Sequence, residues 1–221
     1  MNNNLTELVF ILDKSGSMHG MEKDTIGGFN SMIEKQKAVE GNVFISTILF
    51  SNFSEVIHDR KSLEDIPPLT KQDYQTGGCT ALLDAIGDAI KHVSNIHKYA
   101  RDEDVPDHTL FVITTDGMEN ASTKYTSNQI KEMIKKQEKS GWEFLFLAAN
   151  IDAVETADSI GIRQDRAVNY CVEEDTGAMY KELSDAVCMC RTYGSLPKSY
   201  SAKMEANIKN KKRHEKKTIN T

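Results

Sequence analysis

The 221-residue chain is poor in cysteine and proline and contains no long apolar run. Its four cysteines (Cys79, Cys171, Cys188 and Cys190) are scattered apart from one C-x-C pair, so they provide neither a disulfide framework nor paired zinc-binding dyads. We therefore expect free thiols, as in the reducing cytosol. The six histidines include no H-E-x-x-H motif or other paired zinc spacing.

Membrane and export signals are also missing. No apolar stretch approaches the roughly 20 residues that a transmembrane helix needs. The first four residues lack the basic start and the apolar core of a secretory signal peptide. A chain of this length buries roughly 70% of the surface that its unfolded form exposes, so it needs no disulfide or structural metal to fold. We expect a cytoplasmic protein without a membrane segment.

The net charge of −6 is unevenly distributed along the chain. Residues 198–221 carry eight Lys or Arg and two Glu, a sum of +6, which leaves −12 for residues 1–197. An acidic body disfavours nucleic acid as its main partner and leaves that possibility only to the basic tail. We expect one domain over 1–197 and a polar, partly helical extension over 198–221, in which Met204 and Ile208 are the only apolar pair at helical spacing.

Short apolar runs alternate with amphipathic stretches along the body, which is typical of a mostly parallel sheet flanked by helices. Strands are expected at 8–12, 43–50, 54–59, 110–114, 142–148 and 167–171, and helices at 22–39, 80–97, 127–140, 151–160 and 176–193. Only three residues, 51–53, separate the second strand from the third, so the third should run antiparallel at the edge. The prediction is a three-layer α/β/α Rossmann-like sandwich whose central sheet is mostly parallel with one short antiparallel edge strand.

Helical spacing also predicts which residues face the core. The expected inner faces are Ile26, Phe29, Ile33 and Lys37 in the first helix, Leu83, Ile86, Ala89, Ile90 and Val93 in the second, and Met179, Leu183, Ala186 and Cys190 in the last.

Polar clusters occur at three places along the body, two of them just after an expected strand. The segment 13–17 (D-K-S-G-S) comes directly after the first strand, a G-G-C-T loop at 77–80 opens a helix, and Asp116-Gly117 follows the strand at 110–114. The carboxyl ends of parallel strands share one edge of a sheet, and ligands of open α/β sheets bind at that edge. We therefore expect the three clusters to lie together.

The side chains in these clusters are all hard oxygen donors: Asp13, Ser15, Ser17, Thr80 and Asp116. Oxygen ligands in near-octahedral geometry suit Mg²⁺ or Mn²⁺. Residues 13, 15 and 17 alternate, so they can face one ion, while the glycine at 16 permits a tight bend. Thr80 alone is equally well explained as a helix cap. The combination of all three clusters favours a metal site.

At these residues the chain resembles the von Willebrand factor A (integrin I-like) family, whose metal-ion-dependent adhesion site has the form D-x-S-x-S, then Thr, then Asp. The resemblance covers about residues 5–195 and implies an intact site. It implies that Ser15 and Ser17 are direct ligands and that Thr80 is a third, direct or through water. Asp13 and Asp116 would act partly through water. Cys79, just before the threonine, departs from the pattern without removing a ligand.

The segments 148–153 and 167–170 also resemble a bacterial cytosolic branch of the family, some members of which sit beside tellurite-resistance or stress systems. The resemblance implies a binding module and no enzyme. In such a module, an Asp or Glu of a partner protein completes the coordination of the divalent cation.

Other functions fit these residues less well. Haloacid-dehalogenase-like phosphohydrolases also begin with Asp after a first strand, but they need a second Asp at the position of Ser15, and Asp116 is followed by glycine where a further acid is needed. Residues 15–20 do not supply the G-x-G-x-x-G of a dinucleotide site. A Mg²⁺-dependent phosphohydrolase and a scaffold that binds through its basic tail stay open as alternatives.

Several residues beside the clusters allow two interpretations. His19 is close enough to line the site, although a solvated loop position is favoured. Glu119 and Asn120 are either ligand contacts or the polar start of a helix. Cys79 is either a redox-sensitive thiol or, as favoured here, a packed one.

Overall fold

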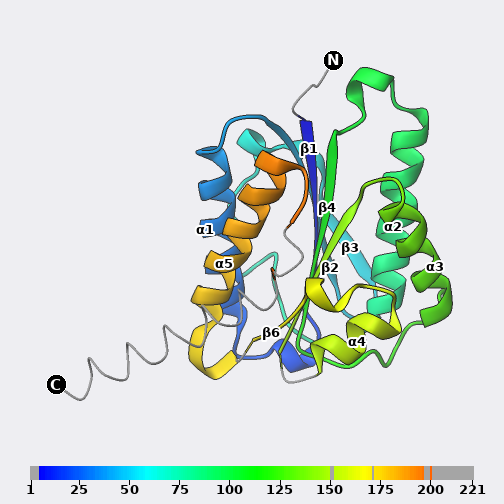
Figure 1. Ribbon diagram of the computed structural model, residues 1–221. Helices are drawn as coiled ribbons and strands as arrows, with labels where there is room; N and C mark the ends of the chain where they lie inside the picture. The colour runs from blue at the N-terminus through cyan, green and yellow to red at the C-terminus, as the bar shows by residue number, and fades with distance from the viewer. Residues whose placement is uncertain (1–4, 150–151, 171, 197–199, 201–221) are drawn as a thin grey trace.

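A computed structural model of the chain describes residues 5–149, 152–170, 172–196 and 200. Its six strands form one sheet in the order β3-β2-β1-β4-β5-β6 (Figure 1). The strands are β1 (Leu5–Asp13), β2 (Asn42–Phe50), β3 (Ser54–Ser62), β4 (His108–Thr115), β5 (Glu143–Ala149) and β6 (Ala167–Tyr170). Neighbouring strands are parallel except β2 and β3, which are antiparallel. The predicted antiparallel edge strand is confirmed, but it is not short: β3 continues to Ser62 and equals β1 and β2 in length.

Helices cover both faces of this sheet. They are α1 (Glu22–Lys37), α2 (Leu82–Tyr99), α3 (Ser127–Glu138), α4 (Ala153–Ser159) and α5 (Val172–Tyr193). Figure 1 shows α1 and α5 side by side on one face and α2, α3 and α4 on the other. The predicted three-layer α/β/α sandwich is confirmed.

The first strand lies at the centre of the sheet and is buried along its whole length. Leu8, Phe10 and Leu12 belong to the core beneath α1 and α5, whereas Val9 and Ile11 belong to the core beneath α2 and α3. A strand buried on both faces has a continuous apolar run in place of alternation, which is why the sequence at 8–12 predicted it.

The predicted inner faces of α2 and α5 are confirmed, because the residues expected there are buried. The predicted inner face of α1 is wrong at its last residue, Lys37. Gln36 is buried, and Lys37 is only partly so. Gln36 donates to the Ser184 carbonyl at 3.2 Å and accepts from the guanidinium of Arg191 at 3.0 Å. A polar contact between two helices leaves no apolar signal in the spacing of either one.

The core extends further along the chain than the expected boundary at residue 197. Tyr200 is buried with the residues of α1 and α5, and its hydroxyl donates to the Glu182 carbonyl at 2.6 Å. The other residues of 198–221 lie outside the described ranges, so the extension stays a prediction. None of the helices in those ranges has the length and apolar character that crossing a membrane needs.

Candidate metal centre

Two loops meet at the carboxyl edge of the sheet, where β1 ends. The backbone N–H of Lys14 donates to the Phe50 carbonyl at 2.7 Å, which holds the loop after β1 against the end of β2. Gly16 N–H donates to the Gly78 carbonyl at 2.9 Å, and Gly77 N–H donates to the Lys14 carbonyl at 2.8 Å. This pair of bonds joins the D-K-S-G-S segment to the loop that carries Thr80, although the two are about 60 residues apart in the sequence.

The carboxylate of Asp13 is buried and held by hydrogen bonds on both oxygens. Its Oδ1 accepts from the Ser15 N–H at 2.7 Å, and its Oδ2 accepts from the Thr115 hydroxyl at 2.6 Å. The hydroxyl of Tyr74 donates to the main-chain carbonyl of the same residue. These contacts leave Asp13 little freedom, so it can fix the loop that presents the two serines.

Three hydroxyls and a second carboxylate converge beside Asp13. Ser15 Oγ lies 3.0 Å from Ser17 Oγ, and the Ser17 hydroxyl donates to Asp116 Oδ1 at 2.6 Å. A Cβ placed on Gly117 would lie 2.9 Å from both Ser17 Oγ and Thr80 Oγ1, and 3.7 Å from Ser15 Oγ. The structure thus brings all five predicted residues together around a space that only a glycine at 117 leaves free.

The donor set and its spacing suit a small hard cation. Adjacent ligands of an octahedral Mg²⁺, each about 2.1 Å from the ion, are about 3 Å apart, which matches the separation of the two serine hydroxyls. Within the described ranges, no group of three or more His, Cys, Asp and Glu residues could hold a metal. These ranges therefore offer hydroxyl and carboxylate oxygens for an ion, and no cluster of thiolates or imidazoles.

The electrostatics of the two carboxylates also favour a cation. Burial raises the pKa of Asp13 above its ordinary value, and the hydrogen bonds from Thr115 and Ser15 oppose this rise only in part. Burial likewise raises the pKa of Asp116, against the hydrogen bond from Ser17. Desolvation disfavours the ionised form of both groups. A nearby divalent cation would stabilise that form.

Thr80 is not a helix cap. The N-cap position of α2 is Ala81, which makes no side-chain capping bond. Asn120 fixes the backbone of Thr80, because its Oδ1 accepts from the Thr80 N–H at 2.9 Å and its own N–H donates to the Thr80 carbonyl at 3.1 Å. The Thr80 hydroxyl is thereby directed to the hydroxyl cluster.

Glu119 is also structural. Its carboxylate accepts from the backbone N–H groups of Leu83 at 2.9 Å and Ser122 at 2.7 Å, so it joins the start of α2 to the loop after β4. Of the two interpretations of Glu119 and Asn120, the polar start of a helix is wrong, since the next helix begins at Ser127. Their side chains accept hydrogen bonds from the backbone at the start of α2 and from Thr80 just before it. The local sequence does not indicate these contacts.

The favoured interpretation of Cys79 was wrong as well. Its thiol is free and exposed, and its backbone N–H donates to Asn52 Oδ1 at 2.9 Å. The predicted solvated position of His19 is confirmed, because its ring is exposed and lies 3.3 Å from Glu22. The described thiols of Cys188 and Cys190 are free, and Cys171 lies outside the described residues.

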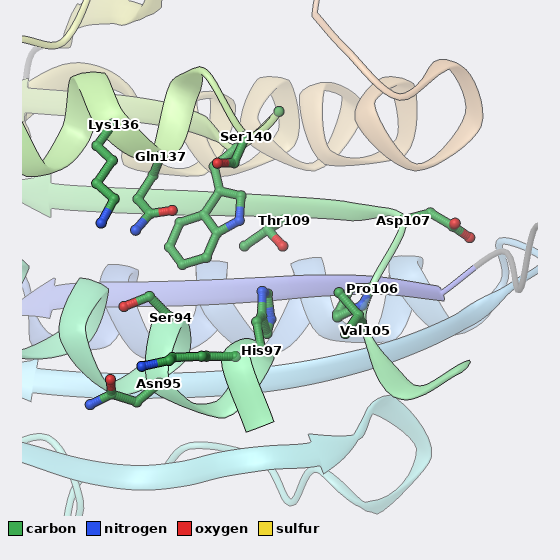
Figure 2. A pocket seen from close by; sticks show the side chains of 13 residues that line it. Ser94, Asn95, His97, Val105, Pro106, Asp107, Thr109, Lys136, Gln137 and Ser140 are labelled. Atoms are coloured by element: carbon green, nitrogen blue, oxygen red, sulfur yellow. The ribbon is translucent and has the colours of Figure 1, made fainter. Parts of the chain in front are cut away.

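A hollow of about 570 Å³ lies at the opposite edge of the sheet, between the ends of α2 and α3 (Figure 2). Thr109, near the start of β4, and His97 line it. His97 is bound to buried Glu7 at 2.6 Å, and the nearby Lys98 ammonium lies over the Tyr99 ring. Asp116 follows the other end of β4, so this hollow is separate from the hydroxyl cluster.

Comparison with known proteins shows the fold. No family model and no curated protein matches the sequence. The von Willebrand factor domain of the type V pili tip protein Mfa5 from Porphyromonas gingivalis is similar in structure, with a TM-score of 0.62 and 11% identity over 87% of this chain and 98% of that one. The chain therefore has the fold of a von Willebrand factor A domain.

Two longer proteins contain the same fold. Proximal thread matrix protein 1 from the mussel byssus, solved with a zinc-occupied metal-ion-dependent adhesion site, has a TM-score of 0.56 at 11% identity over 85% of this chain. The ArnB paralog VWA2 from Sulfolobus acidocaldarius has a TM-score of 0.52 at 18% identity over 83%. The chain spans 47% of the mussel protein and 45% of the archaeal one, slightly under half of each.

Proposed function

We propose that this chain is a metal-dependent protein-binding module that holds one Mg²⁺ or Mn²⁺ at the hydroxyl cluster and binds an Asp or Glu of a partner protein in the cytoplasm. The observation that carries the proposal is the convergence of the Ser15, Ser17 and Thr80 hydroxyls on one point beside Gly117, next to two buried carboxylates. The zinc-occupied site of the mussel protein, which shares the fold, supports it.

The hydrogen bonds suggest a role for each residue. Ser15 and Ser17 would be direct ligands, and Thr80 a third. Asp13 and Asp116 would orient these ligands, as they already do for the Ser15 backbone and the Ser17 hydroxyl. When bound, the divalent cation supplies a coordination position that a carboxylate oxygen can fill. If both aspartates act through water, the site keeps positive charge toward solvent, and an acidic group is favoured there over a neutral one.

The burial of Asp13 favours binding over phosphoryl transfer. An aspartate nucleophile must present an oxygen to its substrate. Both oxygens of Asp13 are engaged by Ser15 and Thr115, and the side chain is buried. The purified protein should therefore not hydrolyse phosphoesters in Mg²⁺, and hydrolysis that disappears in Asp13→Ala would replace our proposal with the phosphohydrolase alternative.

Partner binding is tested by recovering interacting proteins on the immobilised chain in Mg²⁺ and then titrating each purified candidate directly. Binding should be lost with EDTA, in Asp116→Ala, and when one Asp or Glu of the partner becomes Asn or Gln. The control is Asp102→Ala, which removes the same charge from an exposed turn before β4. A partner that binds equally well in excess EDTA would show that the cluster is not its binding site.

The scaffold alternative predicts a different result from the same titration. A chain that ends after residue 202 keeps the buried Tyr200 and loses most of the basic residues of the tail. Under our proposal this shortened chain binds the partner as the full chain does. Loss of binding in it, with metal binding intact, would assign the contact to the tail.

A further inference from the structure

Two large apolar side chains are exposed on loops next to the hydroxyl cluster. Phe53, in the turn between β2 and β3, is 86% exposed, and Met118, two residues after Asp116, is 72% exposed. Single exposed apolar side chains are common on protein surfaces. These two differ from Tyr99 and Tyr193, which are also exposed, because hydrogen bonds join the loops that carry them to the site.

The turn that carries Phe53 is fastened to the loop that presents Thr80. The Ser51 carbonyl accepts from the Ala81 N–H at 2.8 Å, and the Ser51 N–H donates to the Phe53 carbonyl at 3.1 Å. Asn52 Oδ1 accepts from the Cys79 N–H at 2.9 Å. These bonds hold Phe53 beside the residues on either side of Thr80.

Met118 lies on the loop after β4, which is also fastened to the site. On one side of it, Gly117 N–H donates to the Thr115 hydroxyl at 3.2 Å. On its other side, Asn120 makes the two bonds to the Thr80 backbone. The loop is thus fixed at both flanks, and the exposed Met118 side chain stands between two residues that touch the site.

Charged side chains around the cluster are engaged with one another or with the backbone. Lys14 pairs with Glu55 at 2.8 Å, and His19 lies 3.3 Å from Glu22. Glu119 accepts hydrogen bonds from the backbone of α2 and its neighbouring loop. The exposed side chains of Phe53 and Met118 therefore have no such contacts to satisfy. Apolar area of this kind is removed from water when it lies at the centre of an interface with a partner.

We propose that the acidic residue of the partner lies in an apolar segment, with one apolar side chain packing on Phe53 and another on Met118. This inference rests on the proposed function, since the metal-bound carboxylate fixes where the segment lies. It narrows the partner to a chain that presents Asp or Glu between exposed apolar residues. An acidic residue within a wholly polar segment would bind more weakly.

Three synthetic peptides with a fluorescent label test the inference by fluorescence polarisation in Mg²⁺. The first presents an aspartate between two leucines, the second an aspartate between two serines, and the third an asparagine between two leucines. The first should bind about tenfold more tightly than the second, a difference of about 1.4 kcal/mol. The third should not bind, and EDTA should abolish binding of the first.

Two variants locate the apolar contact. In Phe53→Ser/Met118→Ser the first two peptides should bind equally, while calorimetric Mg²⁺ binding stays unchanged. The control Tyr99→Ser removes another exposed aromatic from the far end of α2, about 26 Å from its first residue, and should keep the tenfold preference.

The outcomes separate the two proposals. If the leucine and serine peptides bind the wild type equally, or if the double variant keeps the preference, the inference about the apolar segment is wrong. If neither aspartate peptide binds although Mg²⁺ does, the proposed function itself fails.

Discussion

Two adjacent threonines at the end of β4 have opposite environments. The hydroxyl of Thr115 donates to Asp13 Oδ2 at 2.6 Å and lies 3.2 Å from the Gly117 N–H, so it connects the two acidic loops of the site. The hydroxyl of Thr114 is buried and has no hydrogen-bond partner among the described residues. Because successive residues of a strand point to opposite faces, only one of the pair can reach the cluster.

Thr115→Val should weaken Mg²⁺ binding by about 10- to 100-fold, which is typical when a residue that orients a metal ligand is lost. The matched control Thr114→Val should bind Mg²⁺ as the wild type does. It should also be at least as stable, because it removes an unpaired buried hydroxyl. Isothermal titration calorimetry measures both affinities. Equal affinities in the two variants would show that Asp13 needs no support from Thr115.

His58 gives the fold a dependence on pH. It is buried in β3 beside the Thr47 hydroxyl at 3.1 Å. Burial lowers its pKa, the positive charge of Lys61 lowers it further, and Asp73 opposes them. The folded chain therefore binds this proton less readily than the unfolded chain. The stability from neutral His58 is complete above the ordinary histidine pKa of about 6.5 and is lost as the pH falls below it.

The wild type should accordingly lose more unfolding free energy between pH 7.5 and pH 5.5 than His58→Gln, which keeps a polar group near Thr47 and does not titrate. Urea unfolding at several pH values measures the difference. Parallel pH profiles for the two proteins would contradict a buried neutral His58.

The sequence singled out the five residues that lie together at the candidate site, but not those that hold them in place. Asp13, Ser15 and Ser17 lie within five consecutive positions. Thr80 ends a glycine-containing loop and Asp116 follows an expected strand. The contacts of Tyr74 and Asn120 with this site span about 61 and 40 residues. Nothing in either local sequence indicates such a contact, because only the folded chain brings the loops together. Thr115 could have been suspected, since it directly precedes Asp116.

At the level of whole elements, α1 and α5 pack closely at Gly28, one of two adjacent glycines of α1. A Cβ on Gly28 would lie 2.0 Å from the ring of Tyr180, whereas a Cβ on Gly27 would meet nothing within 4 Å. Tyr180 is a buried residue of α5 and belongs to the core between this helix and α1. The two glycines therefore differ in function although they are neighbours on one helix.

Gly28→Ala should destabilise the fold by about 1–3 kcal/mol, because the new methyl group overfills the contact between the helices. Gly27→Ala should instead stabilise it by about 0.5–1 kcal/mol, the usual gain when alanine replaces glycine inside a helix. Chemical denaturation of both variants measures the two changes. A Gly28→Ala protein as stable as Gly27→Ala would contradict the close approach of α1 and α5.

The elements themselves were largely predictable from the sequence. Apolar runs located the strands because the sheet is covered on both faces, and the three residues between β2 and β3 fixed their antiparallel pairing. The predictions failed where polar groups carry the packing. Gln36 is buried because it contacts Ser184 and Arg191 of α5. Hydrophobic spacing contains no information about such contacts.

In the whole molecule, the distribution of charge opposes an acidic partner at long range. The body carries −12 if the basic tail is counted separately. Repulsion between exposed charges is screened beyond about 8–10 Å at physiological salt. Around the cluster, Lys14 lies against the exposed Glu55, and His19 lies against the partly buried Glu22. We therefore expect the short-range contact with the metal to dominate, and binding to strengthen as the salt concentration rises from low to physiological.

The central claim is that one divalent cation binds where the hydroxyls of Ser15, Ser17 and Thr80 converge, and calorimetric titration with Mg²⁺ or Mn²⁺ tests it most directly. The wild type and the control Gly27→Ala should bind one ion per chain. At about 100 times the dissociation constant, the ion should add about 2.7 kcal/mol to the unfolding free energy. Ser15→Ala/Ser17→Ala, which removes two ligands, and Gly117→Ala, whose methyl group fills the space between the hydroxyls, should fold and bind no ion. A wild type without a metal response, or an equal response in all four proteins, would contradict the account.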